Sequence, residues 1–106
     1  NQRFGFRELA RRHGDYAMVG LCASSDWSSD NLTELRLAYF NVGPRPVLAE
    51  QTASDICRIW PQVRNEMPLD QLESELDPPD DLNASSAMRV HLAKVLTRRV
   101  IEEWLS

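Results

Sequence analysis

The chain has 106 residues, the usual length of one domain, and its composition, 42% hydrophobic and 26% charged, is that of an ordinary globular protein. Its formal net charge of −4 argues against nucleic acid and anionic membranes as partners, because both select for a basic surface. No apolar stretch approaches the roughly 20 residues that a membrane-spanning helix needs, and the chain opens without a secretory signal pattern.

The first segments have strand-like patterns. Residues 3–10 alternate, with Phe4 and Phe6 on one face of a strand. The opposite face carries Arg3, Gly5 and Arg7, and this period-2 pattern is typical of a half-buried strand. After a turn around Gly14, residues 16–23 are almost wholly apolar. Such a run is typical of a buried strand or of a short turn of helix leading into one.

A second pair of patterns follows in the next twenty residues. Residues 24–31 are polar turn residues around a single Trp27, and residues 32–42 alternate again, with Glu34 and Arg36 opposite an apolar face. That apolar face consists of Leu35, Leu37 and Tyr39. We expect two antiparallel strands with their connection, ended by the prolines of residues 43–46.

The second half of the chain has helical spacing. A helix is expected from Ala53 to the boundary at Pro61, and a short amphipathic helix over residues 69–76. A final helix of about 20 residues should span about 30 Å at 1.5 Å per residue. Its apolar stripe is Ala84, Met88, Leu92, Val95, Leu96, Val100 and Trp104. Strands early and helices late predict a two-layer α+β fold, with an antiparallel sheet of three to four strands covered by about three helices.

The residues offer no self-contained active site. Nucleotide-binding glycine motifs and paired metal-ligand motifs are absent from the sequence, so we expect no catalytic residue and no metal site. Trp27, Trp60 and Trp104 fit core or interface positions better than stacking platforms. Cys22 and Cys57 lie within apolar runs, which predicts two buried, reduced thiols and a cytoplasmic protein.

Three stretches carry a family resemblance. The first runs from Phe6 to Gly20 and reads F-R-E-L-A-R-R-H-G-D-Y-A-M-V-G. The second is G-P-R-P-V from Gly43, with Glu50 after it. The third runs from Asp77 to Arg99 and includes S-S-A-M-R-V-H-L-A-K-V-L-T-R-R. Together they resemble the C-terminal domain of the FAD-carrying (medium) subunit in the xanthine dehydrogenase and carbon monoxide dehydrogenase family of molybdenum hydroxylases.

The resemblance implies a role as part of an oxidoreductase. Residues 1–106 would be one domain of a longer flavoprotein, packed against an upstream FAD-binding domain that this chain lacks, with iron–sulfur and molybdenum-cofactor subunits as partners. FAD would be bound by the full-length subunit and not by this domain alone. Because the cofactor carries the redox chemistry, the domain would wall the flavin site rather than catalyse by itself.

Individual residues follow from the same resemblance. Arg7 matches a basic position that approaches the flavin ring in relatives, where a cation could hydrogen-bond a ring carbonyl; the alternative is an exposed residue paired with Glu8 or Asp15. The signature residues Arg11, Arg12, Gly14 and Asp15 imply a turn with an internal ion pair. Arg89 would serve a subunit interface or pair with Asp81.

Two alternatives stay open at this point. One is a non-catalytic protein-interaction or subunit-assembly domain with the same fold. The other is a small autonomous enzyme, which requires a convergent polar pocket that the sequence does not reveal.

Overall fold

The computed structural model describes residues 2–10, 17–42, 45–60, 62–64, 66–78 and 86–105. These residues form a four-stranded antiparallel sheet in the order β1-β2-β3-β4. The strands are β1 (Gln2–Ala10), β2 (Ala17–Ser28), β3 (Asn31–Phe40) and β4 (Val47–Leu48); the helices are α1 (Glu50–Ile59), the 3-10 turn η1 (Gln62–Arg64), α2 (Leu72–Leu76) and α3 (Ser86–Leu105). The predicted α+β class is confirmed, including the long C-terminal helix.

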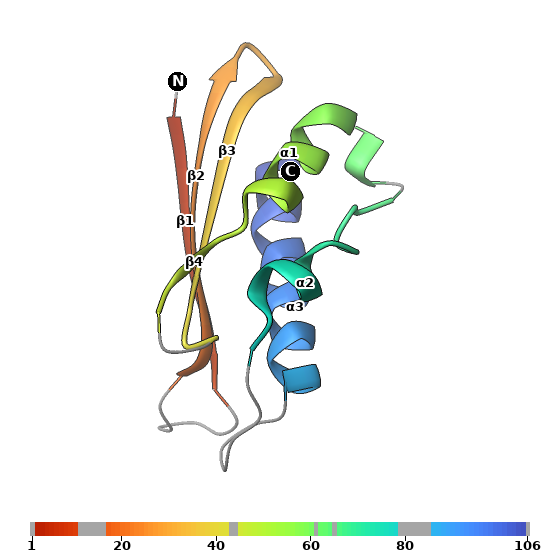
Figure 1. The fold of residues 1–106 in the computed structure, drawn as a ribbon. Helices are drawn as coiled ribbons and strands as arrows, with labels where there is room; N and C mark the ends of the chain where they lie inside the picture. Colours follow the sequence, from red (N-terminus) through yellow and green to blue (C-terminus); the bar gives the residue numbers. More distant parts are fainter. Residues whose placement is uncertain are drawn as a thin grey trace.

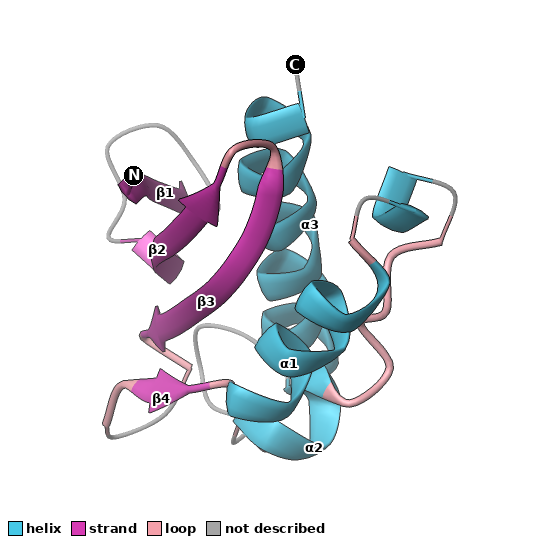
Figure 2. Ribbon diagram, turned by 90° about the horizontal axis from the view of Figure 1, so that it is seen from above, coloured by secondary structure: helices cyan, strands magenta, loops and turns pink. Residues whose placement is uncertain are grey.

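The helices all lie on one side of the sheet (Figure 1). The long helix α3 runs along the strands, and α1 and α2 pack beside it over the β3 and β4 end of the sheet (Figure 2). Core side chains fill the space between the two layers. The opposite side of the sheet carries no described element, and we call it the open face.

The hairpin of β2 and β3 is longer than the sequence predicts. Polar residues 24–31 look like a loop, yet β2 continues to Ser28 and turns only at Ser29 and Asp30. The side chains of Ser25 and Trp27, two residues apart on the strand, are both buried, and the Trp27 indole N–H donates a hydrogen bond to Ser25 Oγ at 2.7 Å. The polar groups of both residues are therefore accommodated within the strand. The predicted inward face of β3 is confirmed, with Leu35, Leu37 and Tyr39 buried.

The inner layer also contains a polar link between β3 and α3. Thr97 donates to the Ala93 carbonyl at 2.7 Å, so its own proton is used and the Tyr39 hydroxyl, 2.6 Å away, is the donor to Thr97. Burial raises the pKa of Tyr39 well above its usual value. The phenol therefore stays protonated and keeps this buried link at any physiological pH.

Helix α1 begins at Glu50, three residues before the predicted start. Ala49 at its N-cap has no side chain that can accept a hydrogen bond, and the cap comes instead from Glu75 of α2. The two carboxylate oxygens accept from Gln51 N at 2.7 Å and Thr52 N at 2.8 Å, and the Thr52 hydroxyl donates to the same group. Glu75 thus provides hydrogen-bond acceptors for backbone N–H groups in the first turn of α1 that Ala49, the local N-cap residue, cannot bind.

Helix α3 has the predicted length, but its buried stripe is rotated from the predicted one. Met88 is 46% exposed, whereas the neighbouring Arg89 is only 7% exposed. The buried positions of this helix are Arg89, Val90, Ala93, Leu96, Thr97, Val100, Ile101 and Trp104. The burial of Arg89 includes its Nε atom, so part of the guanidinium lies inside the fold together with the stem.

The alternation predicted for β1 is confirmed, but the face that meets the helices is the one with Arg3, Gly5 and Arg7. A Cβ on Gly5 would lie 3.0 Å from a Val100 methyl group, so the missing side chain lets α3 approach the strand closely. Arg3 lies 4.3 Å over the Trp27 ring and donates to the Trp104 carbonyl at 3.1 Å. Phe4 and Phe6 consequently point to the open face.

Candidate functional site

An apolar row crosses the open face of the sheet. The strand registers place Phe6 opposite Cys22, Cys22 opposite Ala38, and Ala38 opposite Leu48, so that each strand contributes one residue to the row. Phe6 is 53% exposed and Leu48 is 51% exposed. Large apolar side chains that are this exposed and contiguous mark a surface that packs against another part of a protein. We call these four residues the apolar row.

Aromatic rings extend the row on both sides. The Phe6 and Phe40 rings stack with centroids 5.7 Å apart, and Phe4, one register step along β1, is 71% exposed. The Phe40 ring lies over Gly20, where an added Cβ would come within 2.1 Å of a ring carbon. Because Gly20 has no side chain, the Phe40 ring can lie over it and reach Phe6. The open face thus gathers three aromatic rings, of which those of Phe4 and Phe6 are more than half exposed.

A charged cluster lies beyond the row, toward the β2–β3 turn. The Asp26 carboxylate accepts from Arg36 at 3.3 Å and from the Gln2 amide at 3.1 Å, and Glu34 pairs with Arg36 at 2.9 Å. The hydrogen bond from Gln2, followed by that from Arg36, holds the pKa of Asp26 below its usual value. The open face thus has an apolar region that grades into a polar one.

Arg7 lies on the helix side of β1, next to the apolar row in sequence but on the other side of the sheet. Its guanidinium forms an ion pair with Glu103 of α3 and donates to the Phe6 carbonyl at 2.8 Å. The alternative to flavin contact is an exposed Arg7 paired with Glu8 or Asp15; Asp15 lies outside the described residues, and the ion pair that the structure shows is with Glu103. Among the described strands β1 is the outermost on its side, so both Phe6 and Arg7 lie at that edge of the sheet.

The other predicted site residues divide into two groups. Arg11, Arg12, Gly14 and Asp15 lie outside the described residues. Arg89 belongs to the inner side of α3 and is almost fully buried, so little of its surface remains for a neighbouring subunit. Asp81, its suggested partner, also lies outside the described residues.

The cysteine prediction is wrong for Cys22, which is exposed, while Cys57 is half-buried. Cys22 lies in an apolar stretch, but its register position points to the open face. Burial, followed by the nearby Glu34 carboxylate, raises the pKa of Cys57, which makes its thiolate scarce at neutral pH. The Cys57 thiol is therefore a weaker nucleophile at neutral pH than a fully exposed cysteine.

The three tryptophans form a core cluster, as predicted. The Trp27 and Trp60 rings meet edge to face at 5.1 Å, and those of Trp27 and Trp104 at 6.3 Å. Among the residues that the structure describes, no group of three or more acidic, histidine or cysteine side chains could hold a metal ion. In the same part of the chain, no helix is both long and apolar enough to cross a membrane.

The sequence reasoning missed the open face altogether. The period-2 pattern of residues 3–10 identifies two faces of a strand, yet nothing local says which one meets a helix. The available signal is Gly5 between two phenylalanines, because a glycine in a strand marks a place where another element comes close. That signal points to the glycine face, and not the aromatic face, as the inner one.

Comparison with known proteins gives consistent results. The family model described as the CO dehydrogenase flavoprotein C-terminal domain matches residues 4–104. The chain is 26% identical over 101 residues to the glyceraldehyde dehydrogenase medium chain of Sulfolobus acidocaldarius, covering 92% of this chain and 35% of that protein. It is 29% identical over 101 residues to the caffeine dehydrogenase subunit beta of a Pseudomonas species, covering 92% of this chain and 34% of that subunit.

Solved structures show the same architecture. Quinoline 2-oxidoreductase from Pseudomonas putida 86 superposes with a TM-score of 0.79 at 27% identity, over 96% of this chain and 36% of that one. Carbon monoxide dehydrogenase from Hydrogenophaga pseudoflava has the same fold, with a TM-score of 0.77 at 20% identity over 92% and 34% of the two chains. The chain therefore spans about a third of the length of the relatives it matches.

Proposed function

Because this chain belongs to the family of CO dehydrogenase flavoprotein C-terminal domains, we propose that it completes the FAD-binding subunit of a molybdenum hydroxylase and forms one wall of the flavin site. The upstream FAD-binding part is the partner that packs against it within the subunit. Iron–sulfur and molybdenum-cofactor subunits complete the proposed complex, which we place in the cytoplasm. The two free cysteines fit a reducing compartment.

The observation that carries the proposal is the apolar row with its exposed rings. A sheet face with Phe4 and Phe6 more than half exposed has unburied apolar surface that packing against another domain would remove from water. The same rings offer flat π-faces, which suit a planar aromatic group such as a flavin ring in an offset stack. An apolar cover also excludes water from a redox group.

The residues near the free edge of β1 fit a flavin. When bound, FAD would supply the electron-transfer chemistry, accepting electrons from the iron–sulfur clusters of the complex. Arg7 would place a fixed positive charge beside the ring, and its ion pair with Glu103 would hold the guanidinium in position. A guanidinium has five N–H donors, so the contacts to Glu103 and the Phe6 carbonyl leave donors for a ring carbonyl.

The test is a titration of FAD into the full-length subunit that contains this domain, followed by flavin fluorescence. Phe6→Ala and Arg7→Ala should each weaken FAD binding or change the fluorescence of the bound flavin. Met88→Ala and Arg98→Ala are the matched controls, because both residues are exposed on α3, away from the open face. If the four variants all bind FAD like the parent protein, the domain is a packing or subunit-assembly element and not a wall of the flavin site.

A further inference from the structure

The outer edge of β3 is only partly covered by β4. The short strand β4 pairs with Ala38 and Tyr39, and one more backbone hydrogen bond joins Ala49 N to the Leu37 carbonyl at 2.9 Å. The chain then leaves the sheet, because α1 begins at Glu50. Within the described residues, no other segment forms backbone hydrogen bonds with residues 31–36 on this side. Within the described residues, this part of β3 is therefore a strand edge without a neighbouring strand on its outer side.

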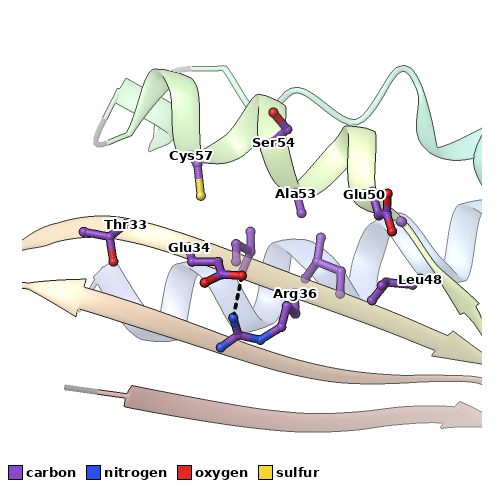
Figure 3. A pocket seen from close by; sticks show the side chains of 11 residues that line it. Thr33, Glu34, Arg36, Leu48, Glu50, Ala53, Ser54 and Cys57 are labelled. Carbon is purple, nitrogen blue, oxygen red and sulfur yellow. Dashed lines mark ion pairs between the residues drawn. The ribbon is translucent and has the colours of Figure 1, made fainter.

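A groove of about 450 Å³ follows that edge under α1 (Figure 3). Its floor is made by the consecutive residues 33–37, so the strand presents its edge to the groove and not just one of its faces. The roof comes from α1, through Ala53, Ser54 and Cys57, and Leu48 of β4 also lines the groove. Backbone groups at a strand edge and an adjacent apolar roof are what an added strand needs.

The charge on the groove selects among possible strands. Two carboxylates, Glu34 and Glu50, and one guanidinium, Arg36, line it. Arg36 pairs with Glu34 at 2.9 Å and with Asp26 at 3.3 Å, so Glu34 and Arg36 offset each other within the lining and Glu50 supplies its excess negative charge. The groove as a whole is therefore weakly acidic and favours basic side chains on whatever enters it.

We propose that residues 31–36 of β3 and the groove under α1 form a docking site for an extended segment of a partner protein, which adds to β3 as a further strand in line with β4. The segment alternates apolar residues, directed under the α1 roof, with lysines or arginines directed toward Glu34 and Glu50. The site lies at the opposite edge of the sheet from β1 and shares Leu48 with the apolar row, whereas Phe4 and Phe6 do not line it.

The experiment uses the full-length subunit and a fluorescein-labelled, acetylated octapeptide that alternates valine and lysine. We expect saturable binding by fluorescence anisotropy, together with slower hydrogen exchange of the residue 31–36 amides. A version with alternate backbone nitrogens methylated should bind at least about tenfold more weakly, because strand addition needs those N–H groups. Replacing lysine with glutamate should weaken binding by roughly three- to tenfold through like-charge repulsion.

Variants of the roof separate docking from a general effect on the fold. Ser54→Trp should fill the groove and abolish binding, whereas Ser54→Ala should bind like the parent protein. Glu50→Lys should weaken binding of the lysine peptide, and Glu73→Lys on α2, which does not line the groove, should not. Circular dichroism and FAD binding of each variant report whether fold and flavin site are intact.

Three outcomes would overturn the proposal. The first is no binding of the lysine peptide at millimolar concentration, and the second is binding that backbone methylation leaves unchanged. The third is protection of residues 31–36 that rises with the concentration of the subunit itself and not with peptide, which would make a second copy of the chain the occupant.

Discussion

Replacing Glu75 tests how α1 is held, because this one carboxylate caps the helix from another element. Glu75→Ala removes the acceptor for Gln51 N, Thr52 N and the Thr52 hydroxyl. Loss of a cap costs about 1 kcal/mol, and loss of a negative charge at a helix N-terminus costs a further ~0.5 kcal/mol. We therefore expect the free energy of unfolding to fall by about 1.5–2 kcal/mol.

The assay is urea denaturation followed by tryptophan fluorescence, which the buried Trp27 cluster reports. Glu73→Ala is the control, because this glutamate lies in the same short helix and is exposed. Glu75→Gln should fall between the two, since the amide oxygen still accepts but carries no charge. If Glu75→Ala lowers the stability by less than about 0.5 kcal/mol, below the range of known caps, then α1 does not depend on this contact.

Three other substitutions have clear expected outcomes. Tyr39→Phe removes the hydroxyl that donates to Thr97 but leaves the Thr97 hydroxyl bonded to the Ala93 carbonyl of its own helix. Urea denaturation should therefore show a fall of about 1 kcal/mol in the free energy of unfolding. A fall of about 3 kcal/mol or more, beyond the usual range for one hydrogen bond, would mean that Tyr39 belongs to a larger network. The pKa of Asp26 is lower in the folded than in the unfolded protein, so Asp26 stabilises the fold above its unfolded pKa, and this stabilisation is lost as the pH falls through its folded pKa. Gln2→Ala should raise the folded pKa of Asp26 in an NMR titration, and an unchanged pKa would contradict the assigned cause. Gly5→Val should press on Val100 and cost about 1–3 kcal/mol by thermal denaturation, whereas an unchanged melting temperature would show that α3 can move away.

The fold could be predicted where a local pattern and its tertiary partner agree. In β3, residues 35, 37 and 39 form the apolar face of the strand, and this is the face that the helices bury. The opposite face carries Glu34 and Arg36, whose charges favour exposure to water. The same reasoning failed for α3, where Met88 and Arg89 lie on adjacent positions of a broad stripe. Only the tertiary packing of α3 decides which of the two is inside, and it is Arg89 that is buried, with its Nε atom.

The candidate site could be predicted only in part, because its features depend on contacts distant in sequence. The start of α1 depends on Glu75, and the position of Arg7 depends on Glu103 at the other end of the chain. The exposed side of β1 depends on how closely α3 approaches Gly5. The family resemblance identified Arg7 as a residue of interest and the alternation placed Phe6 on the opposite face, but neither indicated which of the two faces meets the helices.

The open face and the groove share three described residues, Leu48, Glu34 and Arg36, and this determines how each surface must be tested. Arg36 lines the groove under α1 and also binds Asp26 in the charged cluster of the open face. A substitution of Arg36 would leave two carboxylates without their cation and would alter both surfaces together. Phe6 and Ser54 avoid this problem, because each belongs to one surface and is exposed. If Phe6→Ala affects only the flavin and Ser54→Trp affects only the peptide, the two edges of the sheet act independently even though Leu48, Glu34 and Arg36 belong to both surfaces.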